Sequence, residues 1–415
     1  MAPRLKYKNI DFLNHLGNAD KPSLANIKRI LKSFGDINKD LGIKIAITGT
    51  NGKGSVAKSL STILKNSGFK VGLYTSPHLF KINERIQVND KCISDLELDS
   101  YIKKIIDKQD KFNIKLSYFE LLTSSAIQFF KFKKNDINIF EVGLGGRFDA
   151  TNIIKSDISL ITNVGKDHME YLGNSISKIA NEKAGIIKKR AHVITSATGI
   201  ALSIIKNHAK LQKSEIYEYK KDFIVNNISD SSEYISDKKI VFNSSLKGLH
   251  QKKNLALTLK TCEILQDNFN LKIKKVQNSL SKVKWKCRFQ ILHNNPIKIV
   301  DSAHNINAFN NLIENLDYYY KNKKFIFLLG MLKDKNPINC IKKILPYSKK
   351  ILLFNINNPR SINIDHIMKQ NISRKIVKAN KEDFISYFKS NNNIIVTGSI
   401  YFIGEGFKKN QKLLG

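Results

Sequence analysis

The sequence predicts an α/β fold with mostly parallel sheets, arranged as a larger N-terminal domain and a smaller C-terminal domain. From residue 43 to 200, short apolar runs alternate with helical patterns, which is typical of strand-helix-strand units. A second alternating set starts near residue 297, after a polar interruption. The chain of 415 residues also exceeds the length at which a single core keeps growing. We therefore place the boundary between two domains that cover residues 1–290 and 291–415.

Short apolar runs define the expected strands. In the first domain they cover residues 43–48, 70–75, 137–142 and 158–164, followed by a polar, β-rich stretch at about 215–245 and a helix that contains Asn254. In the second domain they cover residues 297–301, 324–330, 350–355 and 393–398, with helical patterns between them. This second alternation predicts a Rossmann-like α/β domain.

A glycine-dense turn joins the first expected strand to a helix. Residues 47–55 read Ile-Thr-Gly-Thr-Asn-Gly-Lys-Gly-Ser. Glycines allow backbone N–H groups to surround phosphate oxygens, the helix N-terminus adds partial positive charge, and Lys53 adds a full one. An ordinary strand-to-helix turn is the alternative, but Gly-Lys-Gly-Ser at a strand exit is specific in spacing and context. The pattern predicts a P-loop ATPase-like N-terminal domain, although Gly54 separates Lys53 from Ser55, which are adjacent in the commonest form of the loop.

Charge and cysteine content restrict the class of protein. The net charge is +35, but the lysines are scattered beside Asn and Ile and form no stripe with interleaved aromatic residues, so we favour solvated faces over a nucleic-acid-binding surface. The four cysteines contain no Cys-x-x-Cys pair, which indicates neither a zinc site nor a disulfide framework. The sequence has no apolar signal core and no apolar run of membrane-spanning length. We expect a cytoplasmic protein with no membrane partner.

Unusual polar residues follow the ends of the expected strands, which is the edge where open parallel sheets bind ligands. Ser76 follows the second strand, Glu141 closes the third, and His168 follows the fourth. A carboxylate at the end of a buried strand requires a cation. For Glu141 this is either Arg147 in the next loop or Mg²⁺ beside bound phosphates, and we favour Mg²⁺. His168 is either a hydrogen-bonded loop histidine or a metal or phosphate contact.

Lys183 lies on the apolar face of an expected helix. Positions 176, 179, 180, 183, 184 and 187 share that face, and all of them except Lys183 are apolar. A buried ammonium is costly without a partner, and a desolvated lysine is depressed in pKa and open to chemical modification. The alternative is a lysine whose ammonium reaches water along the helix surface.

In the second domain, Asp301 and His304 follow the first expected strand within Asp-Ser-Ala-His-Asn. This loop either faces a ligand or is a plain helix entry with Asp301 or Asn305 as the cap, and the spacing does not separate the two.

In order along the chain, these segments resemble the folylpolyglutamate synthase and dihydrofolate synthase family, a branch of the Mur ligase superfamily. The resemblance is carried by Thr48 to Ser55, Tyr-Thr-Ser-Pro-His-Leu at 74–79 with Asn-Glu-Arg at 83–85, Phe-Glu-Leu-Leu-Thr at 119–123, Glu-Val-Gly-Leu-Gly-Gly-Arg-Phe-Asp-Ala-Thr-Asn at 141–152, Asp-His at 167–168, Glu-Lys-Ala-Gly at 182–185, Arg-Phe-Gln at 288–290, Asp-Ser-Ala-His-Asn at 301–305 and Thr-Gly-Ser at 397–399. They span almost the whole chain.

The resemblance implies an ATP-dependent amide ligase that adds L-glutamate to dihydropteroate, to a folate, or to both, through an acyl phosphate. It implies ATP contacts by Thr50, Asn51, Gly52, Lys53, Gly54, Ser55, Asn254, Arg288, Asp301 and His304, with Asp301 at the ribose and His304 on the phosphate side. Two Mg²⁺ ions are implied, with Ser55, Ser76, Glu141, His168 and a carbamylated Lys183 as ligands. Lys53, His168 and Lys183 would be catalytic, and Phe119, Arg147, Phe148 and Asp149 would bind folate. The expected enzyme is a monomer that closes its domains during catalysis.

Two departures from the family pattern bear on the site. Cys287 stands before Arg288 where the family usually has glycine, so the backbone there is expected to be less permissive. Residues 24–26 read Leu-Ala-Asn where relatives that accept dihydropteroate usually carry an acid and an arginine, which leaves the pterin contacts open. Two other functions remain as alternatives: another Mur-type amino-acid ligase, or a non-catalytic, basic NTP-binding protein. Steeply salt-dependent oligonucleotide binding without acceptor-stimulated ATP turnover would favour the latter.

Overall fold

In a computed structural model of the chain, the structure describes residues 7–17, 23–228, 231–266 and 269–415. The chain divides into two compact units, which are described separately. Unit 1 contains Met1–Asn243 and Lys253–Lys282, and unit 2 contains Ser244–Lys252 and Val283–Gly415. The chain therefore passes into unit 2, returns to unit 1 for two successive helical segments within Lys253–Lys282, and then enters unit 2 again.

An eight-stranded sheet forms the centre of unit 1, in the order β4-β3-β2-β5-β1-β6-β7-β8. Its strands are β1 (Ile43–Thr48), β2 (Val71–Tyr74), β3 (Ile86–Val88), β4 (Lys91–Cys92), β5 (Ile137–Glu141), β6 (Ile158–Ile161), β7 (His192–Thr195) and β8 (Glu215–Glu218). The six neighbouring strands β2-β5-β1-β6-β7-β8 are parallel to one another. Strands β3 and β4 extend the sheet beyond β2 through antiparallel pairs. The predicted parallel strands are confirmed, and β1 lies between β5 and β6 at the centre of the sheet.

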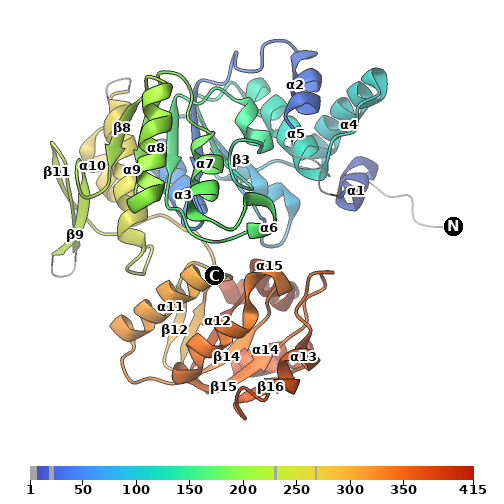
Figure 1. Ribbon diagram of the computed structural model, residues 1–415, viewed down its shortest axis with the longest axis vertical. Helices are drawn as coiled ribbons and strands as arrows, with labels where there is room; N and C mark the ends of the chain where they lie inside the picture. The colour runs from blue at the N-terminus through green and yellow to red at the C-terminus, as the bar shows by residue number, and fades with distance from the viewer. Residues whose placement is uncertain (1–6, 18–22, 229–230, 267–268) are drawn as a thin grey trace. The chain divides into compact units, whose positions relative to one another are not determined.

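Successive side chains of these strands point to opposite faces of the sheet. Both sets are buried, because helices cover both faces (Figure 1). Ile45, Ile47 and Ile139 pack with α3 (Lys53–Asn66), α9 (Gln251–Gln266) and α10 (Ile273–Leu280). On the other face, Tyr74 and Phe140 pack with α1 (Lys8–His15), α2 (Ala25–Lys32), α4 (Asp95–Phe112) and α5 (Tyr118–Lys133). The rest of that face meets α7 (Ile176–Ala184) and α8 (Gly199–Leu211). A short helix, α6 (Met169–Leu172), precedes α7.

The β-rich stretch expected at 215–245 is confirmed, but it divides between two sheets. Its first part is β8 of the large sheet, and the rest forms a separate antiparallel sheet of β9 (Ile224–Ile228), β10 (Ser231–Ile235) and β11 (Lys239–Phe242). Phe223, Val225 and Tyr234 of this region join the core beside α9. The small sheet thus covers α9, the helix that carries Asn254.

Unit 2 contains a six-stranded sheet in the order β12-β13-β17-β14-β15-β16. Its strands are β12 (Gln290–Asn294), β13 (Ile297–Val300), β14 (Phe325–Leu329), β15 (Ser348–Leu353), β16 (Ile376–Lys378) and β17 (Ile394–Thr397), and only β12 is antiparallel. The helices are α11 (Ile306–Tyr319), α12 (Pro337–Ile344), α13 (Ile364–Lys369), α14 (Asp383–Lys389) and α15 (Ile400–Phe407). The predicted mostly parallel second α/β domain is confirmed.

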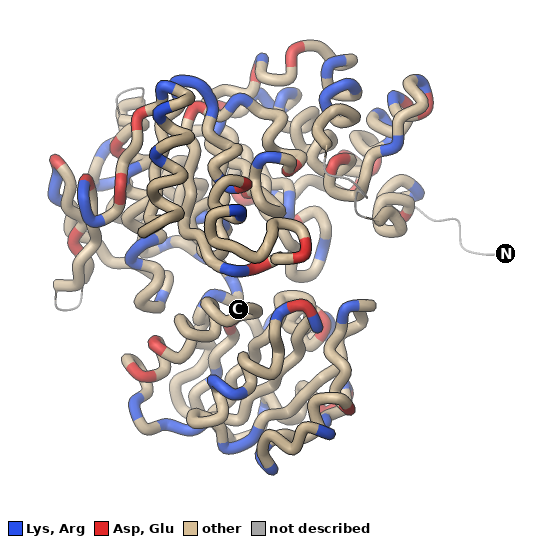
Figure 2. The backbone as a smooth tube through the Cα atoms, in the orientation of Figure 1, with Lys and Arg blue, Asp and Glu red and all other residues tan. Residues whose placement is uncertain are grey.

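Lys and Arg residues are distributed along the backbone of both units, and Asp and Glu residues are interspersed among them along the chain (Figure 2). Within the described part of the chain, no helix combines the length and apolarity required to cross a membrane.

Candidate active site

The glycine-dense turn lies at the carboxyl end of β1 and opens α3, as the sequence predicted. Gly52 immediately precedes the helix with a φ of 88°, and a Cβ there would lie 2.3 Å from the side-chain oxygen of Asn254. Only glycine fits this position, because both the backbone conformation and the space exclude a side chain. The Lys53 ammonium bends back over the turn and donates to the Gly49 carbonyl at 2.9 Å.

The segment after β6 holds this turn. Asn51 N–H donates to the Asn163 side chain at 3.0 Å, and the Thr162 hydroxyl donates to the Asn51 carbonyl at 2.6 Å. The Thr50 hydroxyl exchanges hydrogen bonds with the backbone of Gly165. Consequently β6 ends at Ile161, and the prediction of a strand to residue 164 was wrong, because residues 162–165 bind the phosphate loop.

Glu141 and Ser76 are brought together at the same edge. Glu141 is 5% exposed at the end of β5, and its carboxylate accepts a hydrogen bond from Ser76 N–H at 3.1 Å. Parallel pairing of β5 with β2 and β1 produces this neighbourhood. Arg147, the alternative cation for Glu141, has an exposed side chain, so its position does not supply the buried partner that Glu141 requires.

His168 immediately precedes α6 with a φ of 50°, in the left-handed region, and its N–H donates to the Asp167 carboxylate at 2.9 Å. Ser55 is buried in the first turn of α3. No group of three or more His, Cys, Asp or Glu side chains able to hold a metal was found among the described residues. This finding is compatible with the expected ligand set, because that set consists mainly of hydroxyls and a modified lysine.

Lys183 is 3% exposed on α7, so the predicted orientation toward the core is confirmed and the alternative of an ammonium in water is wrong. Burial, assisted by the nearby charge of Lys53, lowers the pKa of Lys183 to about 7, while Asp167 and Asp149 act in the opposite direction. A large share of the Lys183 side chains is therefore a neutral amine at neutral pH. A neutral, buried amine is the form of lysine that reacts with electrophiles.

The loop after β5 contains the residues expected to bind folate. The buried Asp149 carboxylate accepts hydrogen bonds from Gly143 N–H at 3.0 Å, Leu144 N–H at 2.9 Å and the Thr151 hydroxyl at 2.6 Å. Its side chain thus organises the loop itself. Gly143 lies against the Phe119 ring, where a Cβ would approach to 2.6 Å, and Phe148 is 46% exposed. The loop is rigid at its base and presents an aromatic side chain to solvent.

Unit 2 brings Arg288, Asp301 and His304 together at the carboxyl end of β13. Both oxygens of the buried Asp301 accept backbone hydrogen bonds, from Phe289 N–H at 2.6 Å and Ala303 N–H at 2.8 Å. Burial raises the pKa of Asp301, and the two amides and the Arg288 charge oppose this. Asn305, not Asp301, caps α11 by accepting from Ala308 N–H, so of the two capping residues considered, Asn305 was correct.

Cys287 has a φ of 63° and is fully buried. This left-handed conformation is one that residues with a side chain rarely adopt, so the backbone is strained at the position where the family usually has glycine.

Sequence reasoning did not single out the pair His78 and Arg85. Arg85 Nε–H donates to His78 Nδ1 at 2.9 Å, and the Arg85 guanidinium lies 5.4 Å from the centre of the Tyr118 ring. Because Nδ1 accepts this hydrogen bond, it carries no proton, and the His78 imidazole is neutral. Both residues belong to segments that carried the family resemblance, and this membership was the signal by which the sequence could have identified the pair.

Burial and the Arg85 charge lower the pKa of His78 to about 4, from 6.5 in the unfolded chain. Between these values the unfolded chain binds the extra proton, so stability rises with pH from about 4 to 6.5. We expect His78→Gln, which keeps an acceptor for Arg85, to remove about 2 kcal/mol of this dependence in urea unfolding measured across that range. An unchanged profile for His78→Gln would contradict the assignment.

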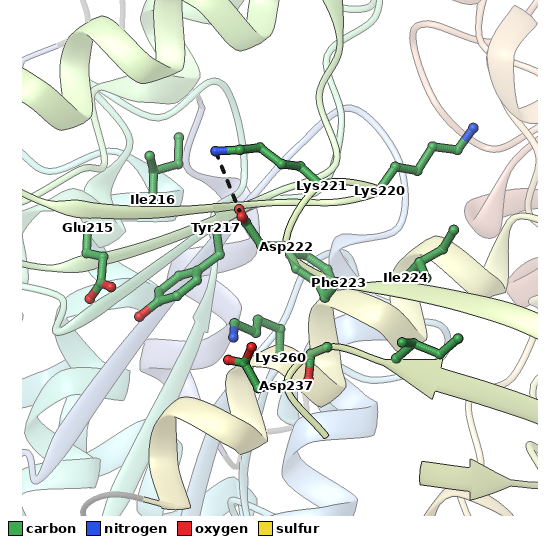
Figure 3. Close-up of a pocket in the computed structure, with 12 residues that line it drawn as sticks. Glu215, Ile216, Tyr217, Lys220, Lys221, Asp222, Phe223, Ile224, Asp237 and Lys260 are labelled. Carbon is green, nitrogen blue, oxygen red and sulfur yellow. Dashed lines mark ion pairs between the residues drawn. The ribbon is translucent and has the colours of Figure 1, made fainter. Parts of the chain in front are cut away.

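A separate cavity of about 510 Å³ in unit 1 contains none of these residues (Figure 3). It is lined by residues of β8, β9, β10, the turns that follow β8 and β10, and α9, including Tyr217, Lys221 and Lys260. The Lys260 ammonium already pairs with Glu263 at 2.9 Å and lies 4.5 Å from the centre of the Tyr217 ring. The buried Lys260 charge therefore already has partners within the protein and does not require a ligand. Because the cavity also contains none of the expected site residues, we do not assign it as the candidate site.

Comparison with known proteins agrees with this geometry. Residues 47–262 match the Mur ligase middle domain, and residues 287–400 match the Mur ligase, glutamate ligase domain. The dihydrofolate synthase/folylpolyglutamate synthase of Bacillus subtilis (strain 168) is 32% identical over 405 residues, covering 93% of this chain and 94% of that protein. The structure of folylpolyglutamate synthase from Thermotoga maritima has a TM-score of 0.86 at 29% identity and covers 98% of this chain and 97% of its own.

A bifunctional folylpolyglutamate synthase/dihydrofolate synthase, solved with Mn, AMPPNP and L-glutamate bound, has a TM-score of 0.87 at 25% identity, with 97% of each chain covered. A parallel α/β unit with a phosphate loop, followed by a second α/β unit, defines an ATP-dependent ligase of the Mur type. Within that class, the chain belongs to the dihydrofolate synthase/folylpolyglutamate synthase family.

Proposed function

We propose that this ligase adds L-glutamate to dihydropteroate and to tetrahydrofolate, so that one chain has both synthase activities. The observation that carries the proposal is the arrangement at one sheet edge of unit 1. The phosphate loop opens α3 there, and the buried Lys183 lies within electrostatic reach of Lys53. The Lys53 ammonium would stabilise the charge that develops during phosphoryl transfer.

The reaction requires activation of a carboxylate, which is a poor electrophile because its charge repels nucleophiles. An acceptor carboxylate oxygen attacks the γ-phosphorus of ATP, the bond to the bridging oxygen breaks, and ADP leaves. The glutamate amine then attacks the acyl carbon, loses a proton, and expels inorganic phosphate. Lys53 and the loop N–H groups would hold the β- and γ-phosphates, with Thr50, Asn51 and Gly54 shaping the loop and Asn254 lying against Gly52.

The divalent ions would be Mg²⁺ held by Ser55, Ser76, Glu141, His168 and a carbamylated Lys183. The buried Glu141 carboxylate beside Ser76 fits such a role, because hard cations prefer oxygen ligands. Magnesium would supply electrostatic stabilisation of the phosphates. Arg288, Asp301 and His304 of unit 2 would contact the nucleotide, Asp301 at the ribose. Phe119 of α5 and Arg147 and Phe148 of the loop after β5 would bind the pteroyl group, while Asp149 would orient that loop. A cytoplasmic monomer remains our prediction.

The decisive experiment is product analysis with ATP, Mg²⁺ and L-glutamate, supplying dihydropteroate in one reaction and tetrahydrofolate in another. We expect dihydrofolate from the first, and a product with one more glutamate from the second, each with stoichiometric ADP and phosphate. Omission of the acceptor or of glutamate should abolish the amide product. Product from only one acceptor would reject dual activity, and product from neither would reject the proposed function.

A further inference from the structure

Two segments of the candidate site are packed against each other without intervening side chains. A Cβ on Gly146 would lie 2.5 Å from the Glu182 carbonyl, and a Cβ on Gly185 would lie 2.5 Å from the Cβ of Arg147. In addition, Arg147 N–H donates to the Glu182 carbonyl at 2.8 Å. The loop that carries Arg147 and Phe148 therefore rests directly on the end of α7, the turn that carries Lys183.

Asn152 fastens this contact. Its side-chain amide donates to the Arg147 carbonyl at 2.9 Å and to the Gly185 carbonyl at 3.0 Å, one from each segment. The two N–H groups of the Asn152 amide have fixed directions, so they can reach both carbonyls only when the plane of the amide is held in one orientation. The two donor bonds use both N–H groups of Asn152, which leaves the side-chain oxygen to fix that orientation.

Lys188 supplies the required contact. Its ammonium donates to the Asn152 side-chain oxygen at 2.7 Å and to the Asn152 backbone carbonyl at 2.9 Å. The backbone of Lys188 is itself held, since its carbonyl accepts from the Ser214 hydroxyl at 2.8 Å. Charge-assisted hydrogen bonds are about twice as strong as neutral ones, and partial burial increases their strength. Burial also lowers the pKa of Lys188 to about 8, which leaves it mostly protonated at neutral pH.

We propose that Lys188 is a positioning residue for the ligase reaction: by fixing the amide of Asn152, it holds the pteroyl-binding loop in register with the turn that carries Lys183. This inference rests on the proposed function for its effect on turnover, but not for its effect on the loop. The phosphate loop has supports of its own in Thr162, Asn163 and Gly165. Its hydrogen bond to the pteroyl-binding loop, from the Thr48 hydroxyl to the Gly145 carbonyl at 2.6 Å, involves neither Asn152 nor Lys188. Loss of Lys188 should therefore affect the acceptor and leave ATP binding intact.

The test compares Lys188→Met, Lys188→Arg and the neighbouring exposed Lys189→Met in the full chain. For Lys188→Met we expect the KM for the pteroyl acceptor to rise about tenfold, which corresponds to the loss of one strong hydrogen bond. The KM for ATP should change less than twofold. Lys188→Arg, which retains a cationic donor, should recover most of the acceptor affinity, and Lys189→Met should behave as wild type.

Amide hydrogen exchange provides a readout that does not depend on turnover. In Lys188→Met, the Arg147 amide should exchange at least about tenfold faster, while the Thr50 amide, which donates to the Asn163 carbonyl, should be unchanged. Unchanged acceptor KM and unchanged Arg147 exchange would overturn the proposal. Equal losses for ATP and acceptor, or equal acceleration at Thr50, would show general destabilisation and also overturn it. If wild-type protein forms no glutamyl product, the proposed function fails, whereas exchange at Arg147 still decides whether Lys188 holds the loop.

Discussion

Lys53→Ala is expected to lower the turnover number for glutamyl product by at least about 10³-fold with either acceptor. Lys53 is the first residue of α3, and its ammonium is already folded back over the phosphate loop through the Gly49 carbonyl. Removal of this charge leaves the loop N–H groups and the helix N-terminus to bind the phosphates, but it removes the cation that offsets charge on the transferred group. The measurement is steady-state formation of ADP and of the amide product.

Lys65→Ala is the matched control, because Lys65 lies on the same helix and pairs with Asp90 at the surface. It should retain wild-type turnover. Circular dichroism and thermal unfolding of both variants would separate lost chemistry from lost structure, and turnover of folded Lys53→Ala within about tenfold of wild type would contradict the role assigned to Lys53.

Lys183→Ala is expected to lose at least about 10²-fold in turnover, and short carboxylic acids such as acetate should restore part of it. In the proposed carbamylation, the neutral amine would attack carbon dioxide, form an N–C bond and release a proton, so that an anionic oxygen ligand would replace the buried amine. The pKa of about 7 makes this neutral amine available at physiological pH. In the alanine variant, a small carboxylate would replace the missing carbamate oxygens.

Two further measurements examine the modification itself. Wild-type protein supplied with ¹³C-labelled bicarbonate should show a carbamate carbon resonance that is absent from Lys183→Ala, independent of turnover. Lys178→Ala, on an exposed position of the same helix, should keep both the resonance and the activity. A folded Lys183→Ala with wild-type turnover, or wild-type protein without the resonance, would argue against carbamylation.

Much of the fold could be predicted because it depends on short-range periodicity. The alternation of apolar runs with helical patterns located β1, β2, β5 and β6, and the spacing around Lys183 placed it on the buried face of α7. The antiparallel strands β3 and β4 and the division of residues 215–245 between two sheets were not predicted. Their placement depends on which strand each segment meets, and apolar content alone does not specify that partner.

Within the candidate site, the contacts that join segments distant in sequence could not be predicted. Asn51 and Asn163 are 112 residues apart, and their hydrogen bond explains why β6 is shorter than expected. Asp149 was expected only as a ligand contact, yet its carboxylate is bonded to its own loop. Lys188 was not singled out, because a lysine beside a second lysine gives no sign of burial in a chain with this composition.

The sequence by itself therefore determined the α/β class, the phosphate loop, the family and the sheet edge at which the chemistry collects, since these follow from contiguous residues and local spacing. Only the tertiary structure decided how that edge is held: which residues support the phosphate loop, how strongly Lys183 is desolvated, and which amide joins its turn to the loop that carries Phe148. Desolvation and hydrogen-bond pairing depend on atoms brought together from separate parts of the chain, such as Lys188 and Asn152, 36 residues apart.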